Sequence, residues 1–301
     1  MIINDTPAHE KRAAFRKNLE SGRLLQFPGA YNPMVAMLIE QTGFDGVYVS
    51  GAVMANSLGL PDIGMTTLTE VSQTASSIAR VTALPTIMDI DTGFGEAMSV
   101  ARTIKELTYL GMAGCHIEDQ VNPKRCGHLD NKALVPVSDM VQKVRAAADA
   151  KTDPNFLLIA RTDARGVEGL DAAIDRAKAY ADAGADMIFP EAMASEAEFE
   201  AFRKAIDVPL LANMTEFGKS KLLHKSQLEN LGYNLVIYPV TTQRLAMYAV
   251  EQGLNAIKQD GSQERVLGQM QTRSRLYEVL GYEDYNAYDS SLYNFKLSDQ
   301  Q

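Results

Sequence analysis

The sequence is poor in cysteine, in positive charge and in long apolar runs. It has only two cysteines, Cys115 and Cys126, among 301 residues, too few for a disulfide framework and typical of a reducing compartment. The formal net charge is -9, so the surface is not the cationic one that nucleic acids and anionic membranes attract. No apolar run approaches the roughly 20 residues of a membrane-spanning helix, and residues 1–17 lack the apolar segment of a signal peptide. We therefore expect a cytoplasmic protein without nucleic-acid or membrane partners.

A glycine followed by an apolar run recurs along the chain. The glycine is well placed to end a preceding helix in the left-handed conformation, and the apolar run is typical of a strand in a parallel sheet covered on both faces. The copies of this pattern are 43–50, 111–118, 184–191 and 232–239. Between them lie the apolar runs 24–30, 85–89, 156–161 and 209–213. The pattern predicts parallel strands separated by helices.

Helical periodicity supports this alternation. Apolar residues recur at three- and four-residue spacing in 67–81, 96–110, 138–150, 169–183, 195–206 and 241–258. Ser138 and Ser195 are candidate N-caps. Strands alternating with helices in this number predict an α/β fold, a (β/α)₈ TIM-type barrel, in a single domain over 1–301. A doubly wound open sheet is the alternative, but no Gly-x-Gly-x-x-Gly follows the first strand.

Beyond the barrel, the amphipathic stretch 263–280 predicts an extra helix. It belongs to a helical C-terminal extension, about 262–301, that also contains a tyrosine-rich tail. No low-complexity linker divides it from the rest of the chain. We expect it to make an oligomer contact rather than a second domain.

Polar side chains follow the predicted strands. In a barrel of this kind the chemistry lies at the C-terminal ends of the strands. Any one polar residue there could be a helix cap or a satisfied turn, but their convergence on one barrel mouth indicates an active site. These residues are Tyr48, Ser50, Asp89, Asp91, Glu118, Arg161, Asp163, Glu191, Asn213, Thr215, Glu216 and Arg244.

The carboxylates at this mouth predict a bound cation. Asp62, Asp89, Asp91, Glu118 and Glu191 would repel one another if they were left alone. Because the ligands are oxygens, without clustered histidine or cysteine, Mg²⁺ or Mn²⁺ is favoured over zinc. Asp89 and Asp91 are the candidates for direct metal contact, with Asp62 and Glu118 supporting it through water. The alternative is that Asp89 and Asp91 only cap the next helix.

Arginines supply the opposite charge. Guanidinium groups bind carboxylates and phosphates through paired hydrogen bonds, so Arg161, Arg244, Arg125 and Arg273 indicate a site for a polyanionic small molecule. Arg273 lies in the predicted extra helix and could instead be a solvated surface charge.

The segment Lys124-Arg125-Cys126-Gly127-His128 follows the carboxylates. Neighbouring positive charge favours a cysteine thiolate, and Gly127 lets the backbone approach a ligand closely. His128 is a candidate donor to a ligand carboxylate, whereas His116, in the middle of a strand, is expected to be a satisfied core histidine. The alternative reading is a flexible basic loop with an incidental thiol.

Several of these motifs together resemble the isocitrate lyase and phosphoenolpyruvate mutase superfamily. The resemblance runs from about residue 25 to 277. It rests on Tyr-Val-Ser-Gly (48–51), Gly-Leu-Pro-Asp-Ile-Gly (59–64), Asp-Ile-Asp-Thr-Gly-Phe-Gly (89–95), His-Ile-Glu-Asp-Gln (116–120), Lys-Arg-Cys-Gly-His (124–128), Ala-Arg-Thr-Asp-Ala (160–164), Phe-Pro-Glu-Ala (189–192) and Asn-Met-Thr-Glu-Phe-Gly (213–218). The 124–128 and 213–218 motifs and the compact length resemble the 2-methylisocitrate lyase branch. One departure is Ser50-Gly51-Ala52, where that branch often has a run of glycines.

The resemblance implies an activity and roles for individual residues. The activity is Mg²⁺-dependent cleavage of a tricarboxylate, 2-methylisocitrate, to pyruvate and succinate, in propionate catabolism by the methylcitrate cycle. Cys126 would be the general acid, and Tyr48 or a metal-linked carboxylate the base. The implied substrate contacts are Ser50, Gly51, Ala52 and Arg161 for the pyruvate half, and Gly127, His128, Asn213, Thr215, Arg244 and Arg273 for the succinate half, with Glu191 and Met214 as further substrate-site residues.

The resemblance also implies a mobile loop and an assembly. Residues 122–134 would form a lid that brings Cys126 to the substrate. The chain would form a homotetramer by exchanging the helix at 263–280 between subunits.

Other functions fit part of the sequence. A lyase acting on isocitrate or a related 2-hydroxy acid, or a hydrolase acting on oxaloacetate, would use the same barrel and metal. A non-catalytic dicarboxylate sensor would not need Cys126. A thiol redox protein would need a Cys-x-x-Cys spacing, which Cys115 and Cys126 lack.

Overall fold

A computed structural model describes residues 6–293 of the chain. They fall into two compact units, Thr6–Arg244 and 245–293. The strands of the described residues all lie in the first unit. They are β1 (Leu25–Pro28), β2 (Val47–Val49), β3 (Thr86–Asp89), β4 (Gly114–Glu118), β5 (Leu157–Thr162), β6 (Met187–Pro190), β7 (Leu211–Asn213) and β8 (Leu235–Tyr238).

These strands close into a parallel barrel. Hydrogen bonds join them in the orders β2-β3-β4-β5-β6 and β1-β8-β7, and every pair is parallel. Isolated parallel bridges, Gly29 with Tyr48 and Ile188 with Leu210, link β1 to β2 and β6 to β7. The predicted (β/α)₈ barrel is confirmed, and the open sheet is excluded because β1 pairs with β8.

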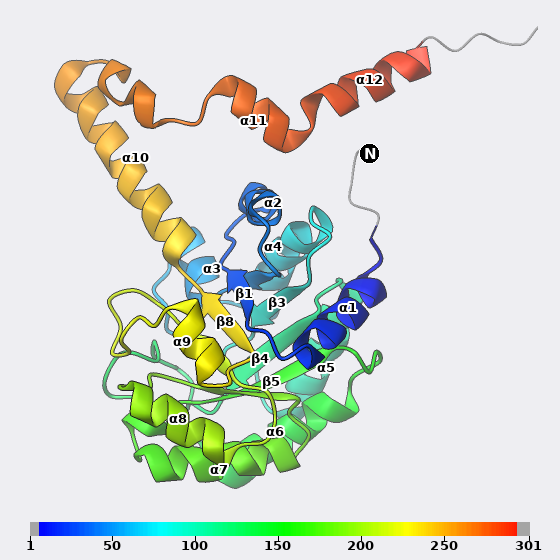
Figure 1. Cartoon of the computed structure of the whole chain (residues 1–301), viewed down its shortest axis with the longest axis vertical. Coiled ribbons are helices and arrows are strands. Elements are labelled where there is room, and N and C mark those ends of the chain that lie inside the picture. The colour runs from blue at the N-terminus through cyan, green and yellow to red at the C-terminus, as the bar shows by residue number, and fades with distance from the viewer. Residues whose placement is uncertain (1–5, 294–301) are drawn as a thin grey trace, which may run out of the picture. The chain divides into compact units, whose positions relative to one another are not determined.

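Helices surround the strands of this unit (Figure 1). They are α1 (Ala8–Glu20), α2 (Pro33–Thr42), α3 (Gly51–Ser57), α4 (Leu68–Arg80), α5 (Ala97–Tyr109), α6 (Val137–Asp149), the 3₁₀ turn η1 (Ala164–Gly166), α7 (Leu170–Asp182), α8 (Glu196–Ala205) and α9 (Lys225–Asn230). The expected glycine stops are present: Gly43 ends α2 with φ 85°, and Gly184 follows α7 with φ 109°.

One predicted N-cap is confirmed and one is wrong. Ser195 caps α8 and accepts a hydrogen bond from the backbone N–H of Glu198. Ser138 lies inside α6, which begins at Val137 after Pro136. Its hydroxyl donates to the Asp139 carboxylate instead.

The first helix, α1, covers the N-terminal ends of the strands. Its Phe15 packs on Phe27 of β1 with ring centroids 5.1 Å apart, in the apolar cluster that fills the barrel. Its buried Arg12 donates to the carbonyl of Met112 just before β4, and Arg16 to that of Phe156 just before β5. Burial of a phenylalanine side chain contributes about 1.5–3 kcal/mol. Because α1 packs over the N-terminal ends of the strands, the barrel interior is closed there. The C-terminal ends remain available for an active site.

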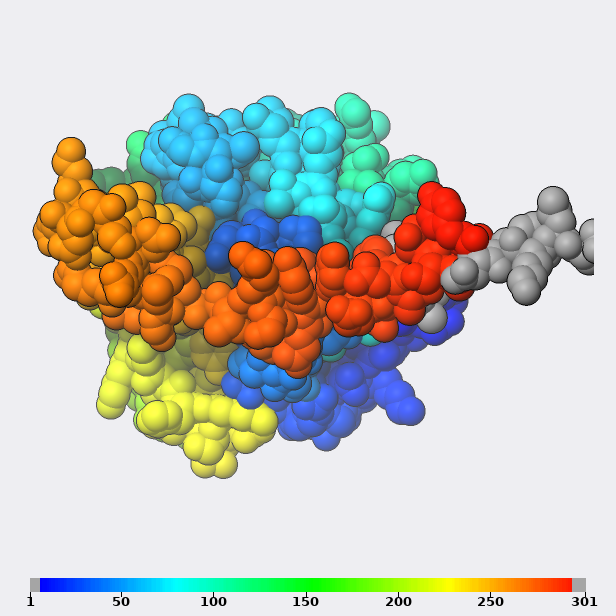
Figure 2. Space-filling model, turned by 90° about the horizontal axis from the view of Figure 1, so that it is seen from above, coloured from blue at the N-terminus to red at the C-terminus, as the bar shows by residue number. Residues whose placement is uncertain are grey.

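The second unit consists of helices. α10 (Thr241–Asp260) begins in the barrel unit and continues into the second, followed by η2 (Glu264–Gln269), α11 (Arg273–Leu280) and α12 (Tyr282–Tyr293); the second unit is drawn in orange and red in Figure 2. The single helix predicted over 263–280 is interrupted, because Met270 is extended and Thr272 caps α11 by accepting from the backbone N–H of Arg275. In the described chain, 6–293, no helix has the length and apolarity to cross a membrane.

Candidate active site

A cavity of about 270 Å³ opens at the C-terminal ends of the strands. It brings together many of the residues that the sequence singled out. These are Tyr48, Ser50, Ala52, Asp62, Asp89, Cys126, Gly127, His128, Arg161, Glu191, Asn213, Thr215 and Arg244. Asn56, Lys124, Phe189, Pro239, Val240 and Gln243 also line it and were not assigned a role from the sequence.

Other predicted residues lie elsewhere. Met214 packs in the apolar core, where its sulfur accepts from the backbone N–H of Leu223, so it does not line the cavity. Arg125 points its guanidinium back to the carbonyls of Pro123 and Lys124. Arg273 begins α11 in the second unit, and its role stays a prediction.

The turn after β2 is fitted to the carboxylate that ends β3. The backbone N–H of Gly51 donates to Asp89 Oδ2 at 3.1 Å. A Cβ at this position would lie 2.9 Å from that oxygen, which is too close, so a glycine is needed here. Of the three residues Ser50-Gly51-Ala52, the middle glycine is thus the one that the geometry requires. Its N–H is already used and is not free for a ligand.

The candidate metal carboxylates lie around a lysine of the loop 122–134. The ammonium of Lys124 is 2.9 Å from Asp91 Oδ1 and also contacts the carboxylate of Asp62. Burial and the neighbouring Asp89 charge raise the pKa of Asp91 to about 6, although Lys124 acts in the opposite direction. Burial alone would raise the pKa of Asp89, but His116, Lys124 and Arg161 outweigh it and lower that pKa. The crowding predicted for these carboxylates is present, and Lys124 is one of the cationic groups that offset it.

The donors in this cluster suit a hard divalent cation. The carboxylates supply oxygens, and neither oxygen of the buried Glu118 accepts a hydrogen bond from the described residues. The described part of the chain holds no group of three His, Cys, Asp or Glu side chains arranged as a metal site. Mg²⁺ usually keeps several waters and binds one or two carboxylates directly, so the residues present fit such an ion.

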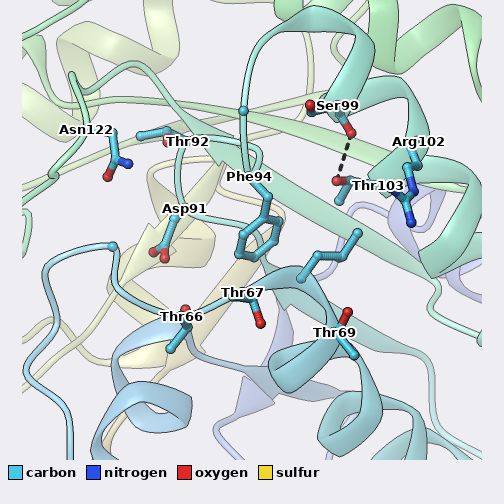
Figure 3. Close-up of a pocket in the computed structure, with 13 residues that line it drawn as sticks. Thr66, Thr67, Thr69, Asp91, Thr92, Phe94, Ser99, Arg102, Thr103 and Asn122 are labelled. Carbon is cyan, nitrogen blue, oxygen red and sulfur yellow. Dashed lines mark hydrogen bonds between the residues drawn. The ribbon is translucent and has the colours of Figure 1, made fainter.

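A second cavity, of about 400 Å³, reaches Asp91 from another side. Figure 3 shows Asp91, Thr66, Thr92 and Asn122 at one end of it, with Ser99 and Thr103 farther along. Asp91 is the residue that it shares with the predicted site. Although it is larger, it contains neither Cys126 nor Tyr48 nor any of the arginines predicted to bind substrate, so the first cavity is the candidate active site.

Arg161 lies buried in the wall of the candidate active site. Asp163 binds it through two hydrogen bonds, 2.9 Å to Nε and 3.1 Å to Nη2, and Glu118 and Glu191 lie 3.3 and 3.4 Å away. The guanidinium also stacks over Phe189, 5.1 Å from the ring centroid. This arrangement fixes a cation where an anionic substrate group can meet it.

Glu191 orients neighbouring side chains. It lies 3.4 Å from Arg161 and 2.8 Å from His128 Nε2, and it accepts from Asn213 Nδ2 at 3.3 Å. Burial would raise its pKa, but Arg161 and His128 outweigh that effect, so its pKa is lowered and the group is ionised. The backbone N–H of Lys219 donates to His128 Nδ1, which leaves the Nε2 proton for Glu191. Glu191 lines the cavity, and its contact with substrate stays a prediction; the structure adds that it holds the side chains of Arg161, His128 and Asn213.

Tyr48 and His116 form a buried pair beside Asp89. The phenol oxygen lies 2.7 Å from His116 Nε2 in a shared hydrogen bond. Burial lowers the pKa of His116 to about 4, and burial, then Asp89, raises the pKa of Tyr48 well above its ordinary value. His116 is buried, as expected, but it is not a satisfied histidine, because its Nδ1 has no hydrogen-bond partner among the described residues. It also orients the phenol, a role that its position in the middle of a strand did not suggest.

The environment of Cys126 differs from the prediction. Burial raises the pKa of its thiol, and the backbone N–H of His128 and the charge of Arg161 do not offset this. The sequence favoured a thiolate because of the adjacent cations, but the Arg125 guanidinium donates to a backbone carbonyl, and the negative charges of Asp62 and Glu191 raise the thiol pKa further. A thiol that keeps its proton is suited to act as an acid.

Comparisons with known proteins point to one family. The family model described as phosphoenolpyruvate phosphomutase matches residues 15–258. The chain is 59% identical over 300 residues to a protein of Corynebacterium glutamicum named probable 2-methylisocitrate lyase 1, covering 99% of this chain and 98% of the relative. It is 45% identical over 300 residues to the 2-methylisocitrate lyase of Bacillus subtilis, covering 99% of both chains.

Solved structures of similar proteins have the same fold. Oxaloacetate acetylhydrolase in complex with 3,3-difluorooxalacetate matches with a TM-score of 0.90 and 32% identity, covering 97% of this chain and 100% of that one. For 2,3-dimethylmalate lyase, described as a member of the PEP mutase/isocitrate lyase superfamily, the TM-score is 0.88, the identity 31% and the coverage 96% and 98%. For phosphonopyruvate hydrolase in complex with oxalate and Mg²⁺, the TM-score is 0.85 and the identity 31%, and the match covers 93% of this chain and 98% of that one.

Proposed function

The chain belongs to the phosphoenolpyruvate phosphomutase family, as its motifs predicted, and we propose that within it this protein is a 2-methylisocitrate lyase. The observation that carries the proposal is geometric: the Cys126 thiol and the fixed Arg161 guanidinium lie on the wall of one cavity beside a carboxylate cluster. The relatives named above, which match over nearly their whole length, carry that activity in their names. Propionate catabolism through the methylcitrate cycle is the corresponding role.

The reaction needs a base, an acid and no co-reactant. The substrate hydroxyl loses its proton, its carbon–oxygen bond becomes the carbonyl of pyruvate, and the adjacent carbon–carbon bond breaks. The electron pair of that bond passes to the succinate fragment, which takes a proton from Cys126. The raised pKa keeps the thiol protonated before this step. Tyr48 and a metal-linked carboxylate acting through water are the two candidates for the group that accepts the hydroxyl proton, and the raised pKa of the Tyr48 phenol, which keeps it protonated, favours the carboxylate.

We propose Mg²⁺ as the cofactor, with Mn²⁺ as a substitute. Asp89 and Asp91 would hold the ion directly, and Asp62 and Glu118 would hold it through water. When bound, a divalent cation polarises the substrate hydroxyl and its adjacent carboxylate. Lys124 contacts two of these carboxylates and balances their charge from the lid loop.

The remaining residues bind the carboxylates of the substrate. Arg161 is proposed to bind the carboxylate of the pyruvate half, with Ser50 and Ala52 beside it. His128, Asn213, Thr215 and Arg244 are proposed to bind the succinate half. Arg244 lies at the exposed rim, where it donates to the carbonyl of Glu216 and stacks 5.2 Å from the Phe217 ring centroid.

A comparison of substrates tests the activity. Purified protein with Mg²⁺ is incubated separately with 2-methylisocitrate, isocitrate and oxaloacetate, and the products are identified by mass spectrometry. We expect pyruvate and succinate from the first acid, well ahead of any turnover of the others. Faster turnover of isocitrate or oxaloacetate would contradict the substrate assignment, and binding without turnover of any acid would support a dicarboxylate sensor.

We also propose a cytoplasmic homotetramer in which the C-terminal unit packs on another copy of the chain. Within 245–293, many large apolar side chains are exposed in the single chain, among them Leu245 (67%), Leu254 (62%) and Tyr288 (51%). Exposed apolar area on this scale marks an interaction site. Light scattering on the full chain tests this, and a monomer would contradict it.

A further inference from the structure

The backbone on each side of Cys126 is held by a side chain from the base of the lid loop. On the N-terminal side, Gln120 Nε2 donates to the carbonyl of Arg125 at 2.9 Å, and its Oε1 accepts from the N–H of the same residue at 2.8 Å. Gln120 is 2% exposed. It therefore satisfies both polar groups of the residue before the cysteine.

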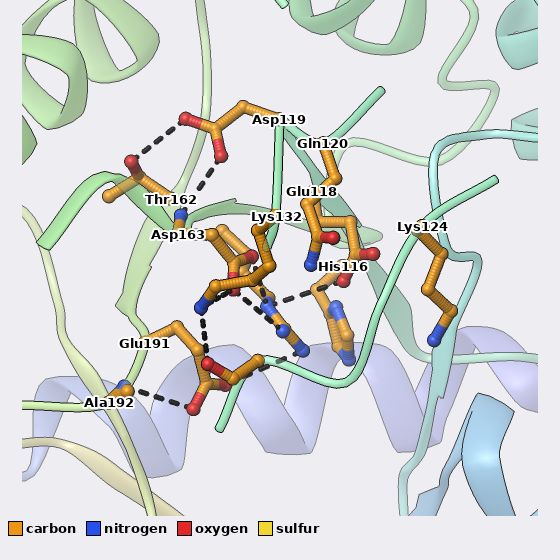
Figure 4. Close-up of polar contacts among 12 residues, drawn as sticks. His116, Glu118, Asp119, Gln120, Lys124, Lys132, Thr162, Asp163, Glu191 and Ala192 are labelled. Atoms are coloured by element: carbon orange, nitrogen blue, oxygen red, sulfur yellow. Dashed lines mark hydrogen bonds and ion pairs between the residues drawn. The ribbon is translucent and has the colours of Figure 1, made fainter. Parts of the chain in front are cut away.

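On the C-terminal side, the side chain of Lys132 has the corresponding position. Its ammonium donates to the carbonyl of Gly127 and lies 2.9 Å from Asp163 Oδ1. The side chain of Lys132 is 3% exposed. Figure 4 shows Lys132 next to Asp163, with Gln120 on the other side of the group. Asp163 also binds Arg161 through two hydrogen bonds.

Gln120 and Lys132 lie close to the two ends of the loop, which are fixed to each other by backbone hydrogen bonds. The N–H of Val121 donates to the carbonyl of Ala133, and the N–H of Val135 to that of Asp119, so the two ends of the loop are joined in a short antiparallel ladder. Between these ends, Gly127 lies directly on the guanidinium, because a Cβ there would be 2.4 Å from Arg161 Nη2. The loop thus has little freedom to shift toward Arg161, and the two side-chain contacts limit movement away from it.

We propose that Gln120 and Lys132 are positioning residues that set the location of the Cys126 thiol, and that Lys132 also links the loop to Arg161 through Asp163. Their effect on catalysis rests on the proposed lyase function. Their effect on the thiol does not.

The two residues should differ in their kinetic effects. Gln120→Leu removes hydrogen bonds to Arg125 alone, so kcat should fall by about tenfold or more, with KM nearly unchanged. Lys132→Met leaves the Gly127 carbonyl without its donor and takes a cation from Asp163. Because Asp163 orients Arg161, this variant should lower kcat by a similar factor and also raise KM several-fold.

The alkylation rate of Cys126 gives a readout that is independent of turnover. Iodoacetamide labelling, followed by peptide mass spectrometry, reports on Cys126, while the fully buried Cys115 serves as the internal reference. Gln120→Leu and Lys132→Met should each raise the Cys126 rate several-fold. Lys132→Arg, which keeps a cationic donor, should lie nearer to the parent protein than Lys132→Met does. Lys151→Met is the matched control, because Lys151 pairs with Asp186 at 3.0 Å at the other end of the barrel, and its rate should match that of the parent.

The outcomes separate this inference from the proposed function. Unchanged labelling and unchanged kcat in both variants would overturn the inference, even if the parent cleaves 2-methylisocitrate. In another outcome, the parent cleaves no 2-methylisocitrate while Cys126 is alkylated faster in both variants than in the parent. That result would support the positioning role and contradict the lyase assignment. Circular dichroism checks that each variant is folded. If Gln120→Leu fails to fold, Gln120→Glu takes its place, since it keeps the acceptor for the Arg125 N–H and loses the donor.

Discussion

Replacement of Glu191 by glutamine is the sharpest test of the electrostatics of the site. The substitution keeps the shape of the side chain and removes a buried negative charge that lies 3.4 Å from Arg161 and 2.8 Å from His128. Removing one partner of a buried ion pair costs about 3–5 kcal/mol when the other charge is left uncompensated. Arg161 keeps Asp163 and Glu118 as partners, so the cost here should be lower, about 1.5–3 kcal/mol, as for a lost hydrogen bond to a charged group. We expect Glu191→Gln to lower the free energy of unfolding by about that amount at neutral pH, as measured by urea denaturation.

The pH dependence of this loss gives a second check. The folded-state pKa of Glu191 is lowered, so its contribution to stability is fully present above its ordinary pKa, near 4.5, and is lost as the pH falls toward the folded-state value. The difference in stability between the parent and Glu191→Gln should therefore be constant from neutral pH to about 5 and should shrink below that.

A matched control is available on the surface. Glu200 forms an exposed ion pair with Lys204 at 2.7 Å, shorter than the distance from Glu191 to Arg161. Because solvent screens exposed pairs, Glu200→Gln should cause little change. Equal stability of Glu191→Gln and the parent at every pH would refute the conclusion that Glu191 is an ionised, paired carboxylate.

Three further predictions concern the chemistry. Cys126→Ser should lower turnover at least about a hundredfold, the contribution typical of an acid catalyst, while Mg²⁺-dependent ligand binding measured by calorimetry is retained; a rate like that of the parent would exclude the acid role. Asp89→Ala should abolish both activity and its dependence on Mg²⁺, and activation by Mg²⁺ in that variant would contradict the metal assignment. Since the pKa of the Cys126 thiol is raised above its ordinary value of 9.0, the decline of kcat at high pH should lie above pH 9, and a decline near pH 7 in a pH-rate profile would contradict a protonated thiol.

Part of the fold could not be read from local patterns. The amphipathic helices α4, α5, α7 and α8 follow the predicted ranges within about one residue at either end. Helix α1 was not predicted, because much of what it buries is charged. Lys11 and Arg12 are nearly inaccessible to solvent and donate to carbonyls of residues 79, 82, 108 and 112. Such a helix lacks the apolar stripe that reveals a buried face.

The candidate site also has a part that the sequence predicted and a part that it did not. The sequence placed its polar residues at the ends of the strands, since a parallel barrel brings those ends to one mouth. It did not reveal that Glu191 holds neighbouring side chains, that His116 orients Tyr48, or that the pKa of Cys126 is raised. Those properties depend on which charges lie within a few ångströms of each group.

Strand and helix positions were determined by the sequence itself, because residue periodicity and glycine stops act over a few neighbouring residues. Membership of the family was determined there too, because the motifs are short and contiguous. Only the tertiary structure decided how the site is held together. Lys132 and Asp163 are 31 residues apart in the chain, and Lys124 and Asp62 are 62 apart. Their pairing follows from closure of the barrel and the path of the loop over it, which local sequence patterns do not encode.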